Sequence, residues 1–121
     1  MIGIGIDAIE IDRFRRVLAR RPGMAARLFT DGERADGERQ RDPAPRLAAR
    51  FAAKEAVMKA LGVGLGAFGF HDVEVLSAAS GAPSLVLRGG AAALATDRGV
   101  VDWRLSLTHT AHIAEAVAVA L

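Results

Sequence analysis

The sequence of 121 residues predicts an α+β fold, in which a mostly antiparallel sheet packs against one long buried helix. Strand-like and helix-like segments follow one another in an order that gives neighbouring strands mostly antiparallel partners. The segment from about residue 46 to 61 is apolar nearly all round, and a helix of that kind is normally buried. The length suits a single domain over residues 1–121.

The first half of the chain predicts one strand followed by helices. Residues 1–9 alternate isoleucine with glycine or aspartate, as in a strand with one apolar face. Residues 11–21 form an amphipathic pattern, and a short helical turn is expected over 24–29. The next helix begins at Thr30 with the Thr-x-x-Glu pattern of a capping box. Residues 37–45 predict an exposed loop before the long helix.

The second half predicts a hairpin, a short helix and two further strands. Alternating apolar and polar residues indicate the strands, and Ser-Gly-Ala-Pro is a turn signal between the first two. The expected segments are a glycine-rich connection (62–69), strands at 70–77 and 84–88 around a turn at 80–83, an alanine-rich helix (89–99), and strands at 102–110 and 112–121.

The last predicted strand is apolar on both of its faces. Ile113, Val117 and Val119 lie on one face, and alanines lie on the other. Both faces should therefore be covered. Because so small a chain has few elements to cover the second face, we predict that this strand lies at a subunit interface.

Composition excludes several classes of site. The chain has no cysteine, which excludes disulfides and thiolate metal sites. No apolar run reaches the roughly 20 residues that span a bilayer, and no signal-peptide pattern is present. We expect a cytoplasmic protein without membrane contact. Walker, Rossmann and nucleophile-elbow motifs are also missing.

The long helix carries three charges within six positions, at Lys54, Glu55 and Lys59. Lys54 and Lys59 are the only lysines of the chain, which has 14 arginines. Lysine is a compact charge on a flexible stem and suits a phosphate ligand. The alternative is an ordinary surface ion pair between Glu55 and Lys59, four residues apart.

Asp7 provides a second carboxylate. It shares strand parity with Gly3 and Gly5, so it projects from the face that these glycines leave bare. If the long helix packs on that face, Asp7 and Glu55 converge. Two carboxylates suit Mg²⁺, which takes its other ligands from water and substrate phosphates. The alternative is that Asp7 caps the following helix.

His109 lies in a Thr-His-Thr segment at the end of a predicted strand. It shares parity with Trp103 and Leu107, so it is either a core histidine or a donor to a phosphate or sugar. His109 and His112 provide too few ligands for zinc.

Arginines are concentrated between residues 13 and 27, in a chain with a formal charge of only +2. They form either a docking face for an acidic partner or a solvated helix face. Nucleic-acid binding is the rival function. A base-stacking surface is hard to build without tyrosine and with one tryptophan, so we expect no nucleic acid as a partner.

Three motifs in this order resemble the holo-acyl-carrier-protein synthases, the short bacterial branch of the 4′-phosphopantetheinyl transferases. They are GIGIDAIEIDRF, RFAAKEAVMKALG and LSLTHT, beginning at residues 3, 50 and 105. The resemblance implies that family's fold and transfer of the phosphopantetheine arm of coenzyme A to a serine of an apo acyl carrier protein. It also implies a requirement for Mg²⁺ and a homotrimer with active sites at subunit interfaces.

The same resemblance implies roles for individual residues. At two positions the chain departs from the family pattern, with Ala82 where the turn usually has lysine and Arg104 near a usual histidine. The general base stays open between Glu55 and Asp7. The implied residues are Asp7, Glu55 and Lys59 for catalysis; Asp7 and Glu55 for the metal; Lys54, Lys59, Gly62, Gly81, Pro83, His109 and Thr110 for the cofactor; and Arg13, Arg16 and Arg20 for the carrier protein.

Overall fold

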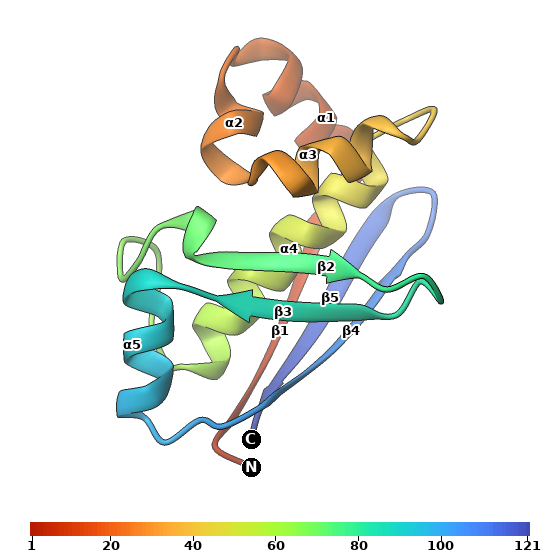
Figure 1. Ribbon diagram of the computed structural model, residues 1–121. Helices are drawn as coiled ribbons and strands as arrows, with labels where there is room; N and C mark the ends of the chain where they lie inside the picture. Colours follow the sequence, from red (N-terminus) through yellow and green to blue (C-terminus); the bar gives the residue numbers. More distant parts are fainter.

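The computed structural model describes residues 1–121 and confirms the α+β class (Figure 1). Five strands and five helices follow one another along the chain, with one short 3₁₀ helix, η1. Their bounds are β1 (Gly3–Glu10), α1 (Ile11–Arg20), α2 (Met24–Leu28), α3 (Asp31–Glu38), α4 (Ala44–Ala60), η1 (Phe70–Asp72), β2 (Val73–Ser77), β3 (Pro83–Leu87), α5 (Gly89–Asp97), β4 (Trp103–His109) and β5 (Ile113–Ala120).

The strands are antiparallel, as predicted, but they form two sheets instead of one. One sheet has the order β1-β5-β4, and β2 and β3 form a separate hairpin. Figure 1 shows the hairpin crossing one side of α4, with β1 and β5 on the other side. The main core contains buried residues of α4, β2, α5 and β5. The prediction of a long buried helix against a sheet is confirmed.

Two glycines allow β1 to lie directly against α4. A Cβ atom on Gly3 would stand 2.0 Å from the carbonyl oxygen of Ala60, and one on Gly5 would stand 1.9 Å from that of Ala56. Real Cβ atoms do not come so close to backbone oxygens. The strand and the helix therefore touch through backbone, and any side chain at these two positions would push them apart.

A second cluster packs α1 and α2 against the beginning of α4. The Phe14 ring lies 6.1 Å from that of Phe29 and 5.5 Å from that of Phe51, measured between centroids.

Thr30 begins α3 as predicted: its Oγ1 accepts from the Glu33 backbone N–H, and Glu33 accepts from the Thr30 N–H. None of the helices is both long and apolar enough to cross a bilayer.

Two predicted boundaries were wrong. The strand expected from residue 70 begins at Val73, because the Asp72 carboxylate accepts from the Gly69 backbone N–H and closes a 3₁₀ turn. The loop expected over 37–45 is shorter, since α3 continues to Glu38 and α4 begins at Ala44. Proline at the start of α4 costs no hydrogen bond there, so the loop signal in the sequence was a helix start.

The outer face of the larger sheet is uncovered within one chain. Ile2, Ile4 and Ile6 are 51%, 58% and 59% exposed. Ile4 pairs with Val119 and Ile6 with Val117, so the apolar surface continues from β1 onto β5. The alanines on the other face of β5 are buried. The two-faced pattern of the last strand therefore leaves an apolar sheet face for another molecule to cover.

We predict that Gly5→Ala lowers the free energy of unfolding by about 3 kcal/mol, because the new Cβ would overlap the Ala56 carbonyl. Urea unfolding followed by circular dichroism measures the loss. Gly64→Ala is the matched control, since a Cβ there meets open space. Equal stability of the two variants would contradict the direct contact between β1 and α4.

Candidate active site

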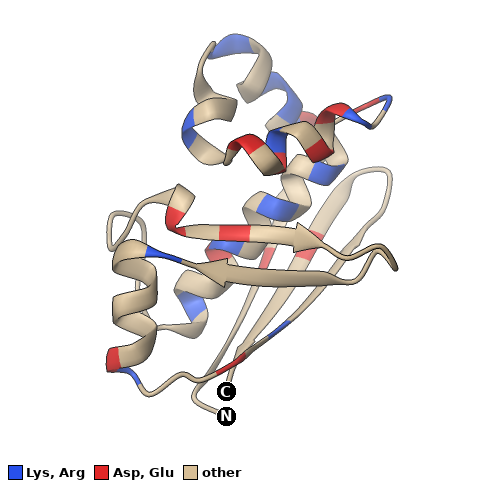
Figure 2. Ribbon diagram, in the orientation of Figure 1, with Lys and Arg blue, Asp and Glu red and all other residues tan.

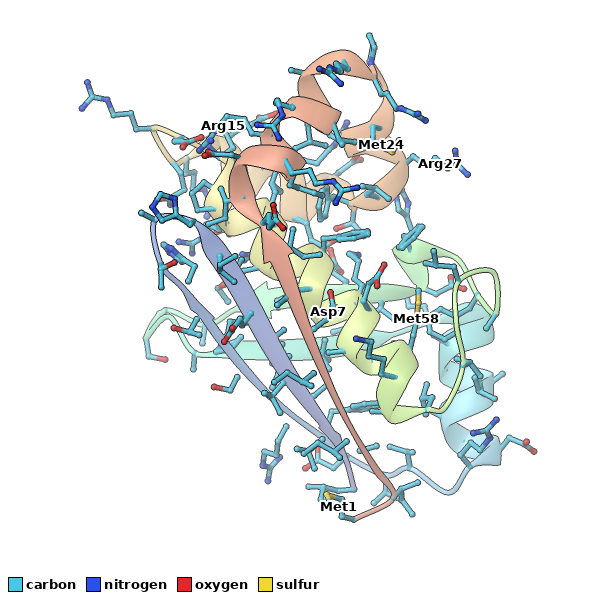
Figure 3. All side chains as sticks on the ribbon, turned by 180° about the vertical axis from the view of Figure 1, so that it is seen from behind. Met1, Asp7, Arg15, Met24, Arg27 and Met58 are labelled. Carbon is cyan, nitrogen blue, oxygen red and sulfur yellow. The ribbon has the colours of Figure 1, made fainter.

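The contact between β1 and α4 brings together the side chains that the sequence places on their facing surfaces. The Lys59 ammonium donates to Asp7 Oδ1 at 3.0 Å and to the Ile6 carbonyl oxygen at 2.9 Å. Figure 3 shows Asp7 on the side of β1 that faces α4. The Asp7 side chain is 12% exposed and that of Lys59 is 54% exposed. The site therefore has a sheltered carboxylate and a lysine that reaches solvent.

Asp7 and Glu55 form a carboxylate pair with an unmet requirement for positive charge. Asp7 Oδ2 is buried and has no hydrogen-bond partner, and such an atom costs free energy unless something else contacts it. Burial raises the pKa of Glu55, the nearby charge of Asp7 raises it further, and Lys59 opposes the rise. The two carboxylates therefore repel each other. A bound cation would relieve both conditions.

The donor set of this pair fits Mg²⁺. No group of three or more histidine, cysteine, aspartate or glutamate side chains comes together to hold a metal. A site with two carboxylates leaves most coordination positions to water and to a phosphate ligand, as Mg²⁺ prefers. Asp7 and Glu55 are the residues that would hold the ion.

Lys54 lies away from this pair, and the structure does not place it where it could bind the cofactor as the resemblance implies. Its side chain has no exposed surface, and its ammonium stands 2.8 Å from Glu33 Oε1. It also donates to the carbonyl oxygens of Phe70 and Val73. Burial lowers the pKa of Lys54, and the Glu33 carboxylate opposes that effect. Lys54 therefore joins α4 to α3 and to the start of β2.

A second polar region lies around the first half of α4. Gly81, Pro83 and His109, which the family resemblance implies for cofactor binding, line one cavity of about 310 Å³. Arg46 and Arg50 of α4 line the same cavity, which we call the arginine cavity. Its walls come from α4, from the turn between β2 and β3, and from the end of β4.

His109 is exposed, so the alternative of a core histidine is wrong. Thr110 does not line the arginine cavity; its Oγ1 accepts from the backbone N–H groups of His112 and Ile113, both at 3.1 Å, and closes the turn into β5. Gly62 lies away from that cavity, just past the end of α4 with φ of +72°, in a hollow that Lys59 also lines.

The sequence predictions missed Arg46 and Arg50. Arg50 is only 3% exposed, its Nη2 donates to Ser77 Oγ at 3.0 Å, and its Nε is buried without a partner. Both arginines contact Asp36 of α3. The available signal was their spacing of four residues in the first half of the helix, which is otherwise apolar and so places two cations on one face.

The arginine cavity and the carboxylate pair lie on opposite sides of α4. Nine positions separate Arg46 from Glu55 and five separate Arg50 from Glu55, which correspond to rotations of roughly 180° and 140° about the helix axis. A ligand in the cavity of one chain is thus separated from the carboxylate pair of the same chain by the helix itself.

The predicted carrier-binding arginines lie on α1. Arg13, Arg16 and Arg20 are exposed, and Figure 2 shows basic positions gathered along α1 and α2. Next to Arg13 is a hollow of about 390 Å³, lined mainly by apolar residues that include Val17 and Met24. This surface combines positive charge with an apolar hollow, which suits an acidic, amphipathic protein surface.

Comparisons with known proteins identify the family. The family model described as the 4′-phosphopantetheinyl transferase superfamily matches residues 3–119. The chain belongs to this superfamily. The holo-acyl-carrier-protein synthase of Streptomyces avermitilis is 50% identical over 120 residues, which cover 99% of this chain and 97% of that protein. The resemblance read from the three motifs is confirmed, and the chain is a 4′-phosphopantetheinyl transferase.

Solved structures of holo-acyl-carrier-protein synthases have the same fold. The enzyme from Neisseria meningitidis has a TM-score of 0.90 at 29% identity, and the match covers 100% of this chain and 98% of that one. The enzyme from Helicobacter pylori, in complex with coenzyme A, has a TM-score of 0.86 at 28% identity, covering 98% and 99%.

The raised pKa of Glu55 predicts a pH-dependent stability change in Glu55→Gln. A carboxylate whose pKa is higher in the folded state favours folding while it is protonated, and that advantage is lost as pH rises through the folded pKa. Without divalent cation, the variant should melt at a higher temperature than the wild type at pH 7.

Differential scanning calorimetry at pH 7 and below pH 4 checks this prediction. At the lower pH Glu55 is protonated in both states, so the advantage of Glu55→Gln should disappear. A variant that is less stable than the wild type at pH 7 would contradict the repulsion between Glu55 and Asp7.

Proposed function

We propose that this transferase moves the 4′-phosphopantetheine group from coenzyme A to a serine of an apo acyl carrier protein, with Mg²⁺, and releases adenosine 3′,5′-bisphosphate. The observation that carries the proposal is the carboxylate pair, with its unpartnered buried oxygen on Asp7 beside the exposed ammonium of Lys59. The relatives named above are holo-acyl-carrier-protein synthases, and one of them binds coenzyme A in its crystal structure.

The reaction needs no nucleophile from this chain. The serine hydroxyl oxygen of the carrier attacks the phosphorus that bears the pantetheine arm, and the bond from that phosphorus to the bridging oxygen breaks. Adenosine 3′,5′-bisphosphate leaves with the electron pair of that bond. The serine proton goes to a base, and Asp7 and Glu55 are the carboxylates that the site offers.

The side chains of the site serve mainly to position and neutralise the pyrophosphate. When bound, a divalent cation would neutralise charge that develops on the pyrophosphate oxygens. Asp7 and Glu55 would hold it, as their repulsion and the unpartnered oxygen indicate. Lys59, 54% exposed at its side chain, can turn its ammonium from Asp7 to a phosphoryl oxygen.

The arginine cavity is the proposed site for the nucleotide end of coenzyme A. Arg46 and Arg50 supply donors and positive charge, and His109 and Ser77 add an imidazole and a hydroxyl. The buried, unpartnered Nε of Arg50 needs an acceptor, which the 3′-phosphate of coenzyme A provides. This assignment agrees with the cofactor binding that the resemblance implies for Gly81 and Pro83.

The opposite placement of the two regions on α4 supports an active site between subunits. One coenzyme A would place its nucleotide in the arginine cavity of one chain and its pyrophosphate at the carboxylate pair of a neighbour. The exposed apolar face formed by Ile2, Ile4 and Ile6 supplies the contact surface. We propose that three copies assemble in this way as a homotrimer.

Intact-mass analysis of an apo acyl carrier protein tests the function. Incubation with this protein, coenzyme A and Mg²⁺ should add one phosphopantetheine group, and EDTA should abolish the gain. Glu55→Gln should lower the rate at least about a hundredfold, since it removes one carboxylate from the cation site. Glu38→Gln, an exposed glutamate on α3, is the control and should keep wild-type activity. No gain in mass across several carriers would contradict the proposal.

Ile6→Asp should dissociate the proposed trimer, because it buries a charge in the sheet face that the copies share. We expect a monomer by sedimentation velocity and loss of transfer activity. Val101→Asp is the control, since Val101 is 88% exposed and lies outside β1, β4 and β5. An active monomer would overturn the interface site.

Arg16→Glu should raise KM for the carrier protein about tenfold while it leaves KM for coenzyme A unchanged, because the helix α1 docks an acidic partner. Steady-state kinetics at low salt measure both constants. Arg16→Lys, which keeps the positive charge at the same position, is the control and should change neither constant. A parallel rise in both constants would show that α1 does not act in docking.

A further inference from the structure

Asp36 of α3 contacts three arginines beside the arginine cavity. Its carboxylate accepts from Arg46 Nε at 2.7 Å, pairs with Arg50 Nη2 at 2.6 Å, and stands 3.7 Å from Arg39 Nη1. The Asp36 side chain is 18% exposed. Asp36 does not itself line the cavity, so its effect on any ligand there passes through the arginines.

The two arginines of the cavity depend on this carboxylate for their placement. Arg46 and Arg50 are four residues apart on α4, where like charges repel. Asp36 lies between α3 and α4, contacts both guanidinium groups and offsets this repulsion. Burial opposes the charge on Asp36, yet the hydrogen bond from Arg46 and the charges of Arg50 and Arg39 hold its pKa below the usual range.

Arg50 is prepared for an anion. Its guanidinium is almost fully buried, with one nitrogen on Asp36, a hydrogen bond to Ser77 and an Nε that has no partner. A planar guanidinium that is already fixed loses little entropy when it binds phosphate. Another acid lines the cavity, Asp42, but Arg15 pairs with it at 2.6 Å.

The turn between β2 and β3, which forms another wall of the cavity, supplies no cation. Ala82 stands between Gly81 and Pro83, both of which line the cavity. The arginines that line the cavity are therefore both on α4. The orientation of Arg46 and Arg50 thus decides how strongly this cavity attracts a phosphate.

We propose that Asp36 is a positioning residue for coenzyme A: it holds Arg46 and Arg50 as a preformed site for the 3′-phosphate and so sets the preference for nucleotides that carry this phosphate. The inference rests on the proposed function of the cavity. It assigns to α3 a part in substrate selection, while the carboxylate pair carries the chemistry.

Isothermal titration calorimetry of the full chain with adenosine 3′,5′-bisphosphate and with adenosine 5′-monophosphate tests the proposal. Asp36→Asn keeps the shape and removes the charge. It should weaken binding of the bisphosphate about tenfold and leave the monophosphate unchanged. Asp36→Glu should restore part of the preference. Asp31→Asn is the matched control, because Asp31 lies on the same helix with a fully exposed side chain.

The kinetic counterpart separates positioning from general stability. With an apo carrier protein, Asp36→Asn should raise KM for coenzyme A about tenfold with little change in kcat, and should not raise KM for 3′-dephospho-coenzyme A. If Asp36→Asn fails to fold, Arg46→Gln should show the same selective loss, since the Arg46 side chain is 37% exposed and tolerates replacement.

Three outcomes would overturn the proposal. An Asp36→Asn protein that binds both nucleotides as the wild type does removes Asp36 from substrate selection and leaves the proposed function intact. Equal weakening of both nucleotides would show a structural role alone. A wild-type protein without preference for the 3′-phosphate would remove the nucleotide site itself, independently of any carrier protein.

Discussion

The backbone contact between β1 and α4 is the constraint on which the rest of the structure depends. Glycines at positions 3 and 5 let the strand lie against the carbonyl oxygens of Ala56 and Ala60, with no room for a Cβ. That distance sets how near Asp7 comes to the helix, and Lys59 contacts Asp7 as a result. The position of the carboxylate pair therefore follows from a packing rule: two elements approach most closely where both lack side-chain bulk.

The helix α4 carries its charges in three different environments. Lys54 is buried in an ion pair with Glu33. Glu55 and Lys59 lie on the side of the helix that faces β1. Arg46 and Arg50 lie on the opposite side. A buried ion pair such as the first resists disruption, since removing one partner typically costs about 3–5 kcal/mol. Each of the other two groups has one side chain that reaches solvent, Lys59 and Arg46. Because they face opposite ways, a ligand that needs both requires a second copy of the chain, and the uncovered sheet face offers the surface for it.

The local sequence pattern was enough to predict the parts of the site that depend on strand alternation and on helical periodicity. Asp7 follows Gly3 and Gly5 by the period of a strand, and Lys59 follows Glu55 by one helical turn, so their facing surfaces could be read from the sequence. Lys54 could not be placed that way, because its partner Glu33 comes from a helix whose packing the sequence does not show. Asp36 and its arginines were missed for the same reason. The 3₁₀ turn at residues 70–72 was predicted as part of a strand because its apolar and polar residues alternate as in a strand.

Titration with Mn²⁺, a paramagnetic substitute for Mg²⁺, followed by electron paramagnetic resonance in the presence of coenzyme A, tests directly whether the carboxylate pair binds the cation. We expect one bound ion per chain in the wild type and its loss in Asp7→Asn, with the fold of that variant confirmed by circular dichroism. Undiminished Mn²⁺ binding in folded Asp7→Asn would show that the carboxylate pair is not the cation site.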